Sequence, residues 1–284
     1  MEENVYINEQ YHDLPLLKNV EHEYIGRDGE VYKETEPVLA EHLVDVYVNE
    51  KLTMKLVCIP EYLTELVLGR LLTEGIIRTA DEVGQIYVCE FGKRVRVMLK
   101  NSAAHDTCPH DSAPKADPGN YVEPTLSCCT GNHILNDYFL TYADIRPVTP
   151  ISWKTSWIFD LADLFSKGMP LHSQTWATHS CFLACEGKLL FQCEDIGRHN
   201  ALDKAIGYAL RNHIDLTKCV VYSSGRIPTD MAMKAIRAGI PILASKASPS
   251  AEAVELAKAY RLTLICAARR DRMKQFCGPA PADT

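Results

Sequence analysis

Residues 194–207 hold more ionisable side chains than a structural element alone would need. They read Glu-Asp-Ile-Gly-Arg-His-Asn-Ala-Leu-Asp-Lys-Ala-Ile-Gly, with six ionisable residues among small and apolar ones. The apolar run 189–191 before them is typical of a strand end, and apolar residues recur at helical spacing up to Leu210 after them. The cluster is therefore predicted at a strand-to-helix turn. In an α/β sheet such a turn lies at the carboxyl edge, where ligands bind and a helix start offers free N–H groups.

We predict ligand contacts at this turn from five polar side chains: Glu194, Asp195, Arg198, His199 and Asn200. The competing interpretation is a capped helix whose charges face solvent. A second polar turn, Ser223-Ser224-Gly225-Arg226, follows another apolar run. Its hydroxyl groups, N–H groups and guanidinium could converge on one phosphate, so Ser224, Gly225 and Arg226 are also predicted contacts. An ordinary turn before Pro228 is the alternative there.

Two adjacent cysteines, Cys128 and Cys129, lie just after a polar stretch that contains four prolines, residues 101–127. Such composition predicts a long mobile loop. A thiolate on that loop could attack a donor persulfide, hold its terminal sulfur and release it again. An adjacent pair could also form a strained and easily reduced disulfide. Burial as small apolar side chains is the alternative for these cysteines.

The same segment allows a metal-binding interpretation, because thiolates and imidazoles are soft ligands. The candidate ligands would be Cys108, His110, Cys128, Cys129 and His133. Their spacing is poor for a structural zinc site, which usually has two clean pairs of ligands.

The elements that position these residues fall into four predicted regions. Residues 1–36 form a polar and acidic lead, interpreted as an arm, and 37–107 form a small α+β domain. Residues 108–147 are the cysteine-bearing loop and linker, and 148–284 are an α/β domain that binds the cofactor. In the small domain we predict strands at 44–48, 54–59, 85–89 and 94–99, with a helix from Pro60 to about Gly75.

The carboxyl-terminal region alternates strands and helices. After a helix that carries Trp153 and Trp157 on one face, we predict strands at 189–192, 219–222, 241–244 and 262–266. Helices reaching Leu210, Ala238 and Tyr260 separate them. This alternation predicts a mostly parallel sheet covered on both faces.

Composition sets outer limits on function. The chain has 284 residues, a net charge of −7 and eleven cysteines, an odd and scattered set. The charge argues against broad nucleic-acid binding, and the cysteines indicate free thiols in a reducing cytoplasm. The sequence shows no secretion signal and no apolar run long enough to span a membrane. One local basic stretch, between Lys258 and Lys274, has six basic residues against the single acid Asp271; a solvated face is its simplest interpretation.

Several segments in order resemble the FdhD family of formate dehydrogenase accessory proteins. They are 46–49, 65–77, 194–207, 224–226 and 244–249, and the resemblance spans roughly residues 37 to 276. It implies a sulfur carrier, or sulfurtransferase, whose larger domain is similar to the cytidine deaminase fold. The zinc signature of the deaminases, His-x-Glu followed by Pro-Cys-x-x-Cys, is not found.

The resemblance also implies partners and roles. Cys128, supported by Cys129, would accept sulfur from a cysteine desulfurase and pass it to the bis-molybdopterin guanine dinucleotide cofactor before that cofactor enters a formate dehydrogenase. His179 would line the cofactor cavity, and the cofactor would also contact the segment after the last predicted strand: Ala267, Ala268, Arg269, Arg270, Asp271 and Arg272. The resemblance also implies that the protein is a homodimer.

The chain departs from the family pattern at two places. Gly131 stands where the second cysteine of a Cys-x-x-Cys motif is expected, and Trp176-Ala177 precede His179 where the family has glycines. Losing that cysteine makes a second function credible, namely a chaperone that binds the cofactor and docks it without transferring sulfur. For the remaining group Cys181, Cys185 and Cys193 the sequence indicates packing and leaves any further role open.

Overall fold

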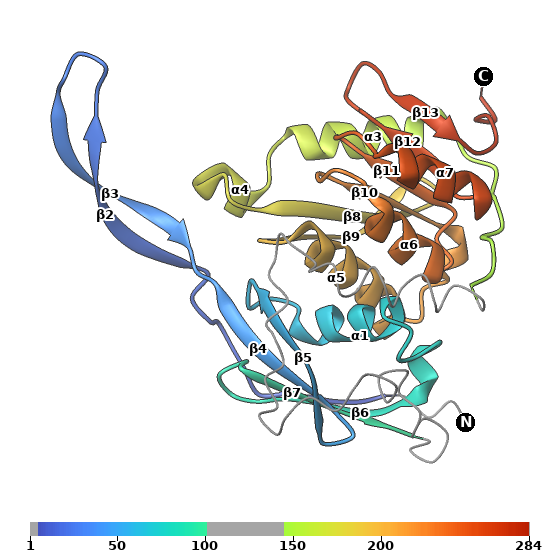
Figure 1. The fold of residues 1–284 in the computed structure, drawn as a ribbon, viewed down its shortest axis with the longest axis horizontal. Helices are drawn as coiled ribbons and strands as arrows, with labels where there is room; N and C mark the ends of the chain where they lie inside the picture. Colours follow the sequence, from blue (N-terminus) through green and yellow to red (C-terminus); the bar gives the residue numbers. More distant parts are fainter. Residues whose placement is uncertain (1–4, 101–144, 284) are drawn as a thin grey trace.

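The computed structural model describes residues 5–100 and 145–283. Cys128 and Cys129, together with the metal-ligand candidates Cys108, His110 and His133, lie outside the described residues. The described chain forms two sheets with helices between and around them, and a separate two-stranded ribbon (Figure 1).

The first sheet has five strands in the order β1-β6-β7-β4-β5. It confirms the strands and the helix predicted for this part of the chain. Their bounds are β1 Tyr6–Glu9, β4 His42–Val48, β5 Lys51–Cys58, the helix α1 Leu63–Thr73, the short 3-10 helix η1 Ala80–Glu82, β6 Val83–Val88 and β7 Arg94–Leu99. Strands β4 and β5 form a tight hairpin through Asn49 and Glu50, which both have positive φ, as a two-residue turn requires.

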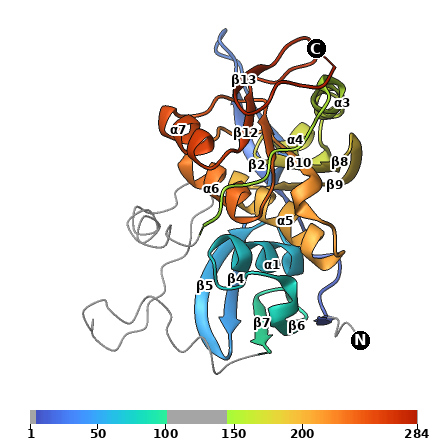
Figure 2. The same ribbon diagram turned by 90° about the vertical axis from the view of Figure 1, so that its right-hand side faces the viewer.

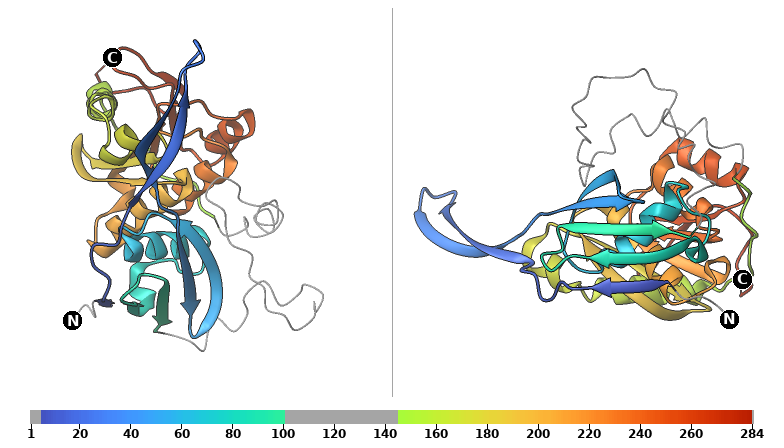
Figure 3. Two further views of the ribbon diagram at one scale, coloured as in Figure 1. Left: turned by 90° about the vertical axis from the view of Figure 1, so that its left-hand side faces the viewer. Right: turned by 90° about the horizontal axis from the view of Figure 1, so that it is seen from below.

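Part of the polar lead is a long antiparallel ribbon of β2 (Leu17–Ile25) and β3 (Val31–Leu39). The ribbon extends well beyond the body of the protein (Figures 1 and 3). The lead also contributes β1, which pairs in parallel with β6 at the edge of the first sheet. Most ribbon side chains are exposed, which explains why apolar periodicity did not reveal these strands.

The second sheet has six strands in the order β13-β12-β11-β10-β8-β9. Their bounds are β8 His179–Cys185, β9 Lys188–Asp195, β10 Cys219–Ser223, β11 Ile242–Ser245, β12 Thr263–Cys266 and β13 Lys274–Cys277. The prediction of a mostly parallel sheet is wrong for its pairings, because only β10–β11 and β11–β12 are parallel among five. Strand β8 was not predicted, and the left-handed turn at Glu186 and Gly187 makes it antiparallel to β9.

Helices cover both faces of the second sheet, as predicted. On one face lie α5 (Arg198–Arg211), α6 (Thr229–Arg237) and α7 (Ala251–Ala259), and on the other lies α3 (Thr155–Ser166), as Figure 2 shows. The short elements α4 (Pro170–Thr175) and η4 (Leu216–Lys218) connect these layers. Alternate residues of each strand enter the two apolar clusters, so that Phe182 faces α3 while Leu183 faces α5.

The two sheets meet where α1 packs against α5. The contact is close enough to require glycine, since a Cβ atom on Gly69 would lie 1.9 Å from the carbonyl oxygen of Asp203. A Cβ atom on Gly207 would lie 1.7 Å from the carbonyl oxygen of Glu65. Residues from both sheets therefore belong to one continuous apolar core.

Candidate functional site

The candidate site lies at one edge of the second sheet, where the carboxyl ends of β9, β10, β11 and β12 meet the start of β8. The strand register places His179 opposite Asp195 and Ser223 opposite Ser245. Backbone bonds continue across this edge, because Ser224 N–H donates to the Ser180 carbonyl at 3.0 Å and Ala268 N–H donates to the Ser245 carbonyl at 3.0 Å. The three segments predicted to bind a ligand therefore share one edge, as the rule for parallel strands requires.

His179 and Ser224 form the centre of this edge. The Oγ atom of Ser224 accepts the Ser180 N–H at 2.9 Å and lies 3.3 Å from Nδ1 of His179. Burial lowers the pKa of His179, and the positive charges of Arg198, His172, His199 and Arg226 lower it further. The two guanidinium groups beside this ring, those of Arg198 and Arg226, indicate a local field that favours an anionic ligand.

Arg198 begins α5 and reaches across the Ser-Gly-Arg turn. A Cβ atom on Gly225 would lie 2.8 Å from both Cβ and Cδ of Arg198, so glycine is required there to admit this side chain. The Nε atom of Arg198 is buried without a hydrogen-bond partner, while Arg226 is exposed. In the part of the chain that the structure describes, neither arginine has an acidic partner, which leaves both guanidinium groups available to an anion.

Glu194 is engaged by the protein itself. Its carboxylate accepts the N–H groups of Leu171 and His172, each at 2.8 Å, and the Thr178 hydroxyl at 2.7 Å. These contacts satisfy the free N–H groups at the start of α4. A direct ligand contact from Glu194 stays a prediction, and the structure gives this residue a supporting role.

Asp195 and Asn200 are likewise occupied. Asp195 forms a fully buried ion pair with Lys204 at 2.6 Å and accepts the N–H of Ile59 at 3.2 Å. The Asn200 amide donates to Asp195 at 2.9 Å and to the Val57 carbonyl at 2.8 Å. These bonds fasten the end of β5 to the start of α5 and fix the direction in which α5 leaves the site.

His199 points to the neighbouring helix rather than to the serine turn. Its Nε2 atom lies 2.8 Å from the carboxylate of Asp230 on α6, and the side chain is buried. This pair ties the start of α5 to the start of α6. It also places another positive charge near His179 whenever His199 is protonated.

The segment 267–272 follows β12 at the same edge. Ala267 has a positive φ of 50° and donates its N–H to the Ala247 carbonyl, and the Ala268 carbonyl accepts the Tyr222 hydroxyl at 2.9 Å. Arg269 N–H closes a turn onto the Arg272 carbonyl at 2.7 Å. The side chains of residues 269–272 are exposed, and Arg270 pairs with Asp163 at 2.9 Å.

This edge can bind an anion, but it lacks an accessible thiol among the residues the structure describes. Cys181 and Cys193, the nearest thiols on β8 and β9, are buried, and burial raises the pKa of both, that of Cys193 to about 12. Within 5–100 and 145–283 no group of three or more His, Cys, Asp or Glu residues could hold a metal ion. A reactive thiol at this edge would have to come from elsewhere in the chain, and the predicted carriers Cys128 and Cys129 lie outside the described residues.

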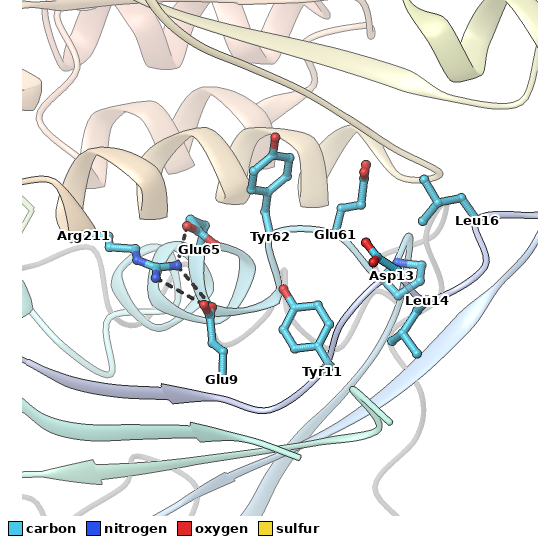
Figure 4. A pocket seen from close by; sticks show the side chains of 10 residues that line it. Glu9, Tyr11, Asp13, Leu14, Leu16, Glu61, Tyr62, Glu65 and Arg211 are labelled. Carbon is cyan, nitrogen blue, oxygen red and sulfur yellow. Dashed lines mark hydrogen bonds and ion pairs between the residues drawn. The ribbon is translucent and has the colours of Figure 1, made fainter. Parts of the chain in front are cut away.

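Sequence reasoning missed a pocket of about 560 Å³ between the lead and the start of α1 (Figure 4). Arg211 bridges two of its carboxylates, lying 3.1 Å from Glu9 and 2.8 Å from Glu65. Burial raises the pKa of Glu61 and brings that of Tyr11 to about 12. No motif marks this pocket, because its walls come from segments about 50 and 200 residues apart.

None of the helices among the described residues is both long and apolar enough to cross a membrane.

The fold and this edge together define a class: a mixed α/β protein with a site suited to an anionic ligand. Comparison with known proteins narrows it. The model of the FdhD/NarQ family matches residues 39–282, and the chain belongs to this family. The sulfur carrier protein FdhD of Listeria monocytogenes serotype 4b is 28% identical over 264 residues, which cover 91% of this chain and 97% of that protein.

Two further comparisons agree. The sulfur carrier protein FdhD of Bacillus pumilus is 31% identical over 254 residues, covering 87% of this chain and 90% of its own. A crystal structure of a candidate formate dehydrogenase accessory protein from Desulfotalea psychrophila superposes with a TM-score of 0.74 at 27% identity, covering 93% of this chain and 98% of that one. The family resemblance noted from the sequence is thus confirmed.

Proposed function

We propose that this protein is a sulfur carrier that serves a formate dehydrogenase. The proposal is supported by family membership over most of the chain and by relatives named as sulfur carrier proteins. The structural observation that carries it is the convergence of His179, Ser224, Arg198 and Arg226 at one edge. We infer that the cargo bound there is bis-molybdopterin guanine dinucleotide, whose phosphates suit that edge, and that the second sheet belongs to a cytidine deaminase-like fold.

The proposed chemistry begins at Cys128. Its thiolate attacks the terminal sulfur of a persulfide on a cysteine desulfurase, the donor cysteine leaves as a thiolate, and Cys128 becomes the persulfide. Attack by Cys129 on the Cys128 sulfur then breaks the bond to the terminal sulfur, which leaves as sulfide for the cargo at the metal end; the Cys128–Cys129 disulfide that remains is reduced back to two thiols by a cellular thiol. Cys129 would support release, because an adjacent thiol can attack the carrier sulfur and free the terminal one.

The described residues contribute binding and orientation. Arg198 and Arg226 would offer charge-assisted hydrogen bonds to phosphate oxygens, which are about twice as strong as neutral ones. Ser224 would add a hydroxyl group, and neutral His179 an uncharged ring nitrogen. Glu194 and the Asp195–Lys204 pair hold the surrounding turns in place. We also propose that the protein acts in the cytoplasm as a homodimer.

Intact-protein mass spectrometry after incubation with a cysteine desulfurase and cysteine tests the proposal. We expect a gain of about one sulfur mass, about 32 Da, that disappears in Cys128→Ala and persists in Cys129→Ala. The matched control is Cys89→Ala, a partly exposed cysteine just after β6. No sulfur gain in any form would exclude transfer from that donor.

A second candidate function is supported by Gly131, which stands where the second motif cysteine is expected. In that case the protein binds the cofactor and docks it to the apo-enzyme without carrying sulfur. A variant with both Cys128→Ala and Cys129→Ala would then still mature the dehydrogenase, whereas a sulfur carrier would bind cofactor and fail to mature it.

A further inference from the structure

Two cysteine pairs face each other across neighbouring strands of the second sheet. Cys185, the last residue of β8, lies opposite Cys219, the first residue of β10. Cys181, further along β8, lies opposite Cys193 on β9. All four are free thiols. The pair Cys185 and Cys219 does not belong to the edge described above, since it lies at the other end of the strands that carry His179 and Ser224.

The register shows how closely Cys185 and Cys219 approach. Ser224 N–H donates to the Ser180 carbonyl, so the pairing that continues β8–β10 has a hydrogen-bonded pair at this position. Hydrogen-bonded and non-hydrogen-bonded pairs alternate along an antiparallel ladder. Five positions further along, with no break in register, Cys185 and Cys219 form a non-hydrogen-bonded pair.

Residues in such a pair have Cα atoms about 4.5 Å apart, and their side chains lie closer than in the other kind of pair. This separation falls within the range that a disulfide bridges, about 4.4 to 6.8 Å. Each thiol influences the pKa of the other, and the Cys219 thiol donates to the Asp215 carbonyl at 3.4 Å. The geometry therefore needs rotation about side-chain bonds rather than movement of the backbone to join the two sulfurs.

The two cysteines differ in access to solvent. Cys185 is partly exposed beside the turn at Glu186 and Gly187, while Cys219 is buried. A small oxidant reaches Cys185 first, and the buried partner is then in place to resolve the product. Burial raises the pKa of both thiols, that of Cys219 to about 12, so the attacking thiolate is scarce at neutral pH and becomes more abundant as pH rises.

We propose that Cys185 and Cys219 are an oxidative modification site that a hydroperoxide converts to an intrachain disulfide. The Cys185 thiolate attacks one peroxide oxygen, the O–O bond breaks, and the products are a sulfenic acid and an alcohol or water. The Cys219 thiol then attacks the sulfenic sulfur, the S–S bond forms, and water leaves with the Cys219 proton. Two thiols lose two electrons in all, and the peroxide gains them.

The disulfide would close a loop that contains β9 and α5, and with them the turn at 194–200. Both bridged strands lead directly to the candidate site. The bridge would therefore stabilise the scaffold of the site against unfolding, because a cross-link of this kind restricts the unfolded chain. The inference does not depend on sulfur transfer, since neither Cys128 nor Cys129 takes part.

The test exposes the full-length protein to hydrogen peroxide, blocks remaining thiols with iodoacetamide, and maps peptides by mass spectrometry. We expect a cross-linked pair of peptides holding Cys185 and Cys219, with a mass about 2 Da below the sum of the reduced forms. The rate of cross-linking should rise between pH 7 and pH 9, because the Cys185 thiolate becomes more abundant. The oxidised protein should also melt several degrees higher than the reduced one.

Matched variants make the result decisive. Cys185→Ser and Cys219→Ser should each abolish the cross-link, and Cys181→Ser should leave it intact, because Cys181 and Cys193 are both buried. Oxidation of Cys185 to sulfinic acid without a cross-link would overturn the proposal. A cross-link that joins Cys181 to Cys193 while Cys185 stays reduced would also overturn it.

Discussion

Replacing Gly69 by alanine should destabilise the protein strongly, because the two sheets meet at this residue. The new Cβ atom would lie 1.9 Å from the Asp203 carbonyl oxygen, a backbone atom that cannot rotate away. To restore an ordinary contact, α1 and α5 would have to separate by roughly 1 Å or more, which loosens a core packed at crystal-like density. Overpacking costs about 1 to 3 kcal/mol, and the upper end applies when the obstacle is backbone.

Alanine favours a helix by about 1 kcal/mol over glycine, which offsets part of this cost. We therefore expect the free energy of unfolding to fall by about 2 kcal/mol. Urea unfolding followed by circular dichroism measures it, with the slope of the transition as a check on cooperativity. Glu252→Ala on the exposed face of α7 is the control. A loss below about 0.5 kcal/mol with an unchanged slope would refute the argument from close packing.

Other predictions follow from the site. Lys204→Met should lower the free energy of unfolding, measured with urea, by about 3 to 5 kcal/mol, because it leaves the buried Asp195 carboxylate without its ion pair. Adding Asp195→Leu should recover part of this loss, and a larger loss in the double variant would contradict the explanation. The pKa of His179 is lowered on folding, so its contribution to stability should be complete above pH 6.5 and be lost as pH falls below it. The midpoint of its NMR titration should lie below 6.5 and rise when pyrophosphate binds. Arg226→Ala should weaken pyrophosphate binding about tenfold by calorimetry, while Arg78→Ala, exposed on the first half of the chain, should leave it unchanged.

The periodicity of apolar residues was sufficient to predict most strands and helices, but it could not reveal strands whose residues do not alternate between buried and accessible positions. Strands β4 and β5 alternate between buried and more accessible residues, which is the signal that periodicity detects. Strand β8 is buried along five consecutive positions and begins with His179 and Ser180, so it shows neither alternation nor an obvious apolar start. Its antiparallel direction depends on a two-residue turn that resembles many loop sequences.

For the candidate site, the sequence predicted where the segments lie but not which of their side chains are occupied by contacts within the protein. The strand-turn-helix pattern correctly brought His199, Ser224 and the segment after β12 to one edge, because topology alone decides which strand ends meet. Sequence could not show that Asp195 is neutralised by Lys204 or that Asn200 bonds to Val57, a residue 143 positions away. Such long-range contacts distinguish a side chain that supports a site from one that faces a ligand.

The contact between α1 and α5 also determines what a cut in the backbone would do. A chain opened between residues 100 and 145 would give two fragments, each presenting a groove shaped to the backbone of the other. If the fragments separated, the carboxylate of Asp203 would lose the hydroxyl of Thr73, which donates to it at 2.9 Å from the other fragment. Neither fragment could cover its share of the core alone, so the two would behave as an obligate heterodimer. The contact between α1 and α5 is therefore an interface within one chain that has the close packing of an obligate dimer interface.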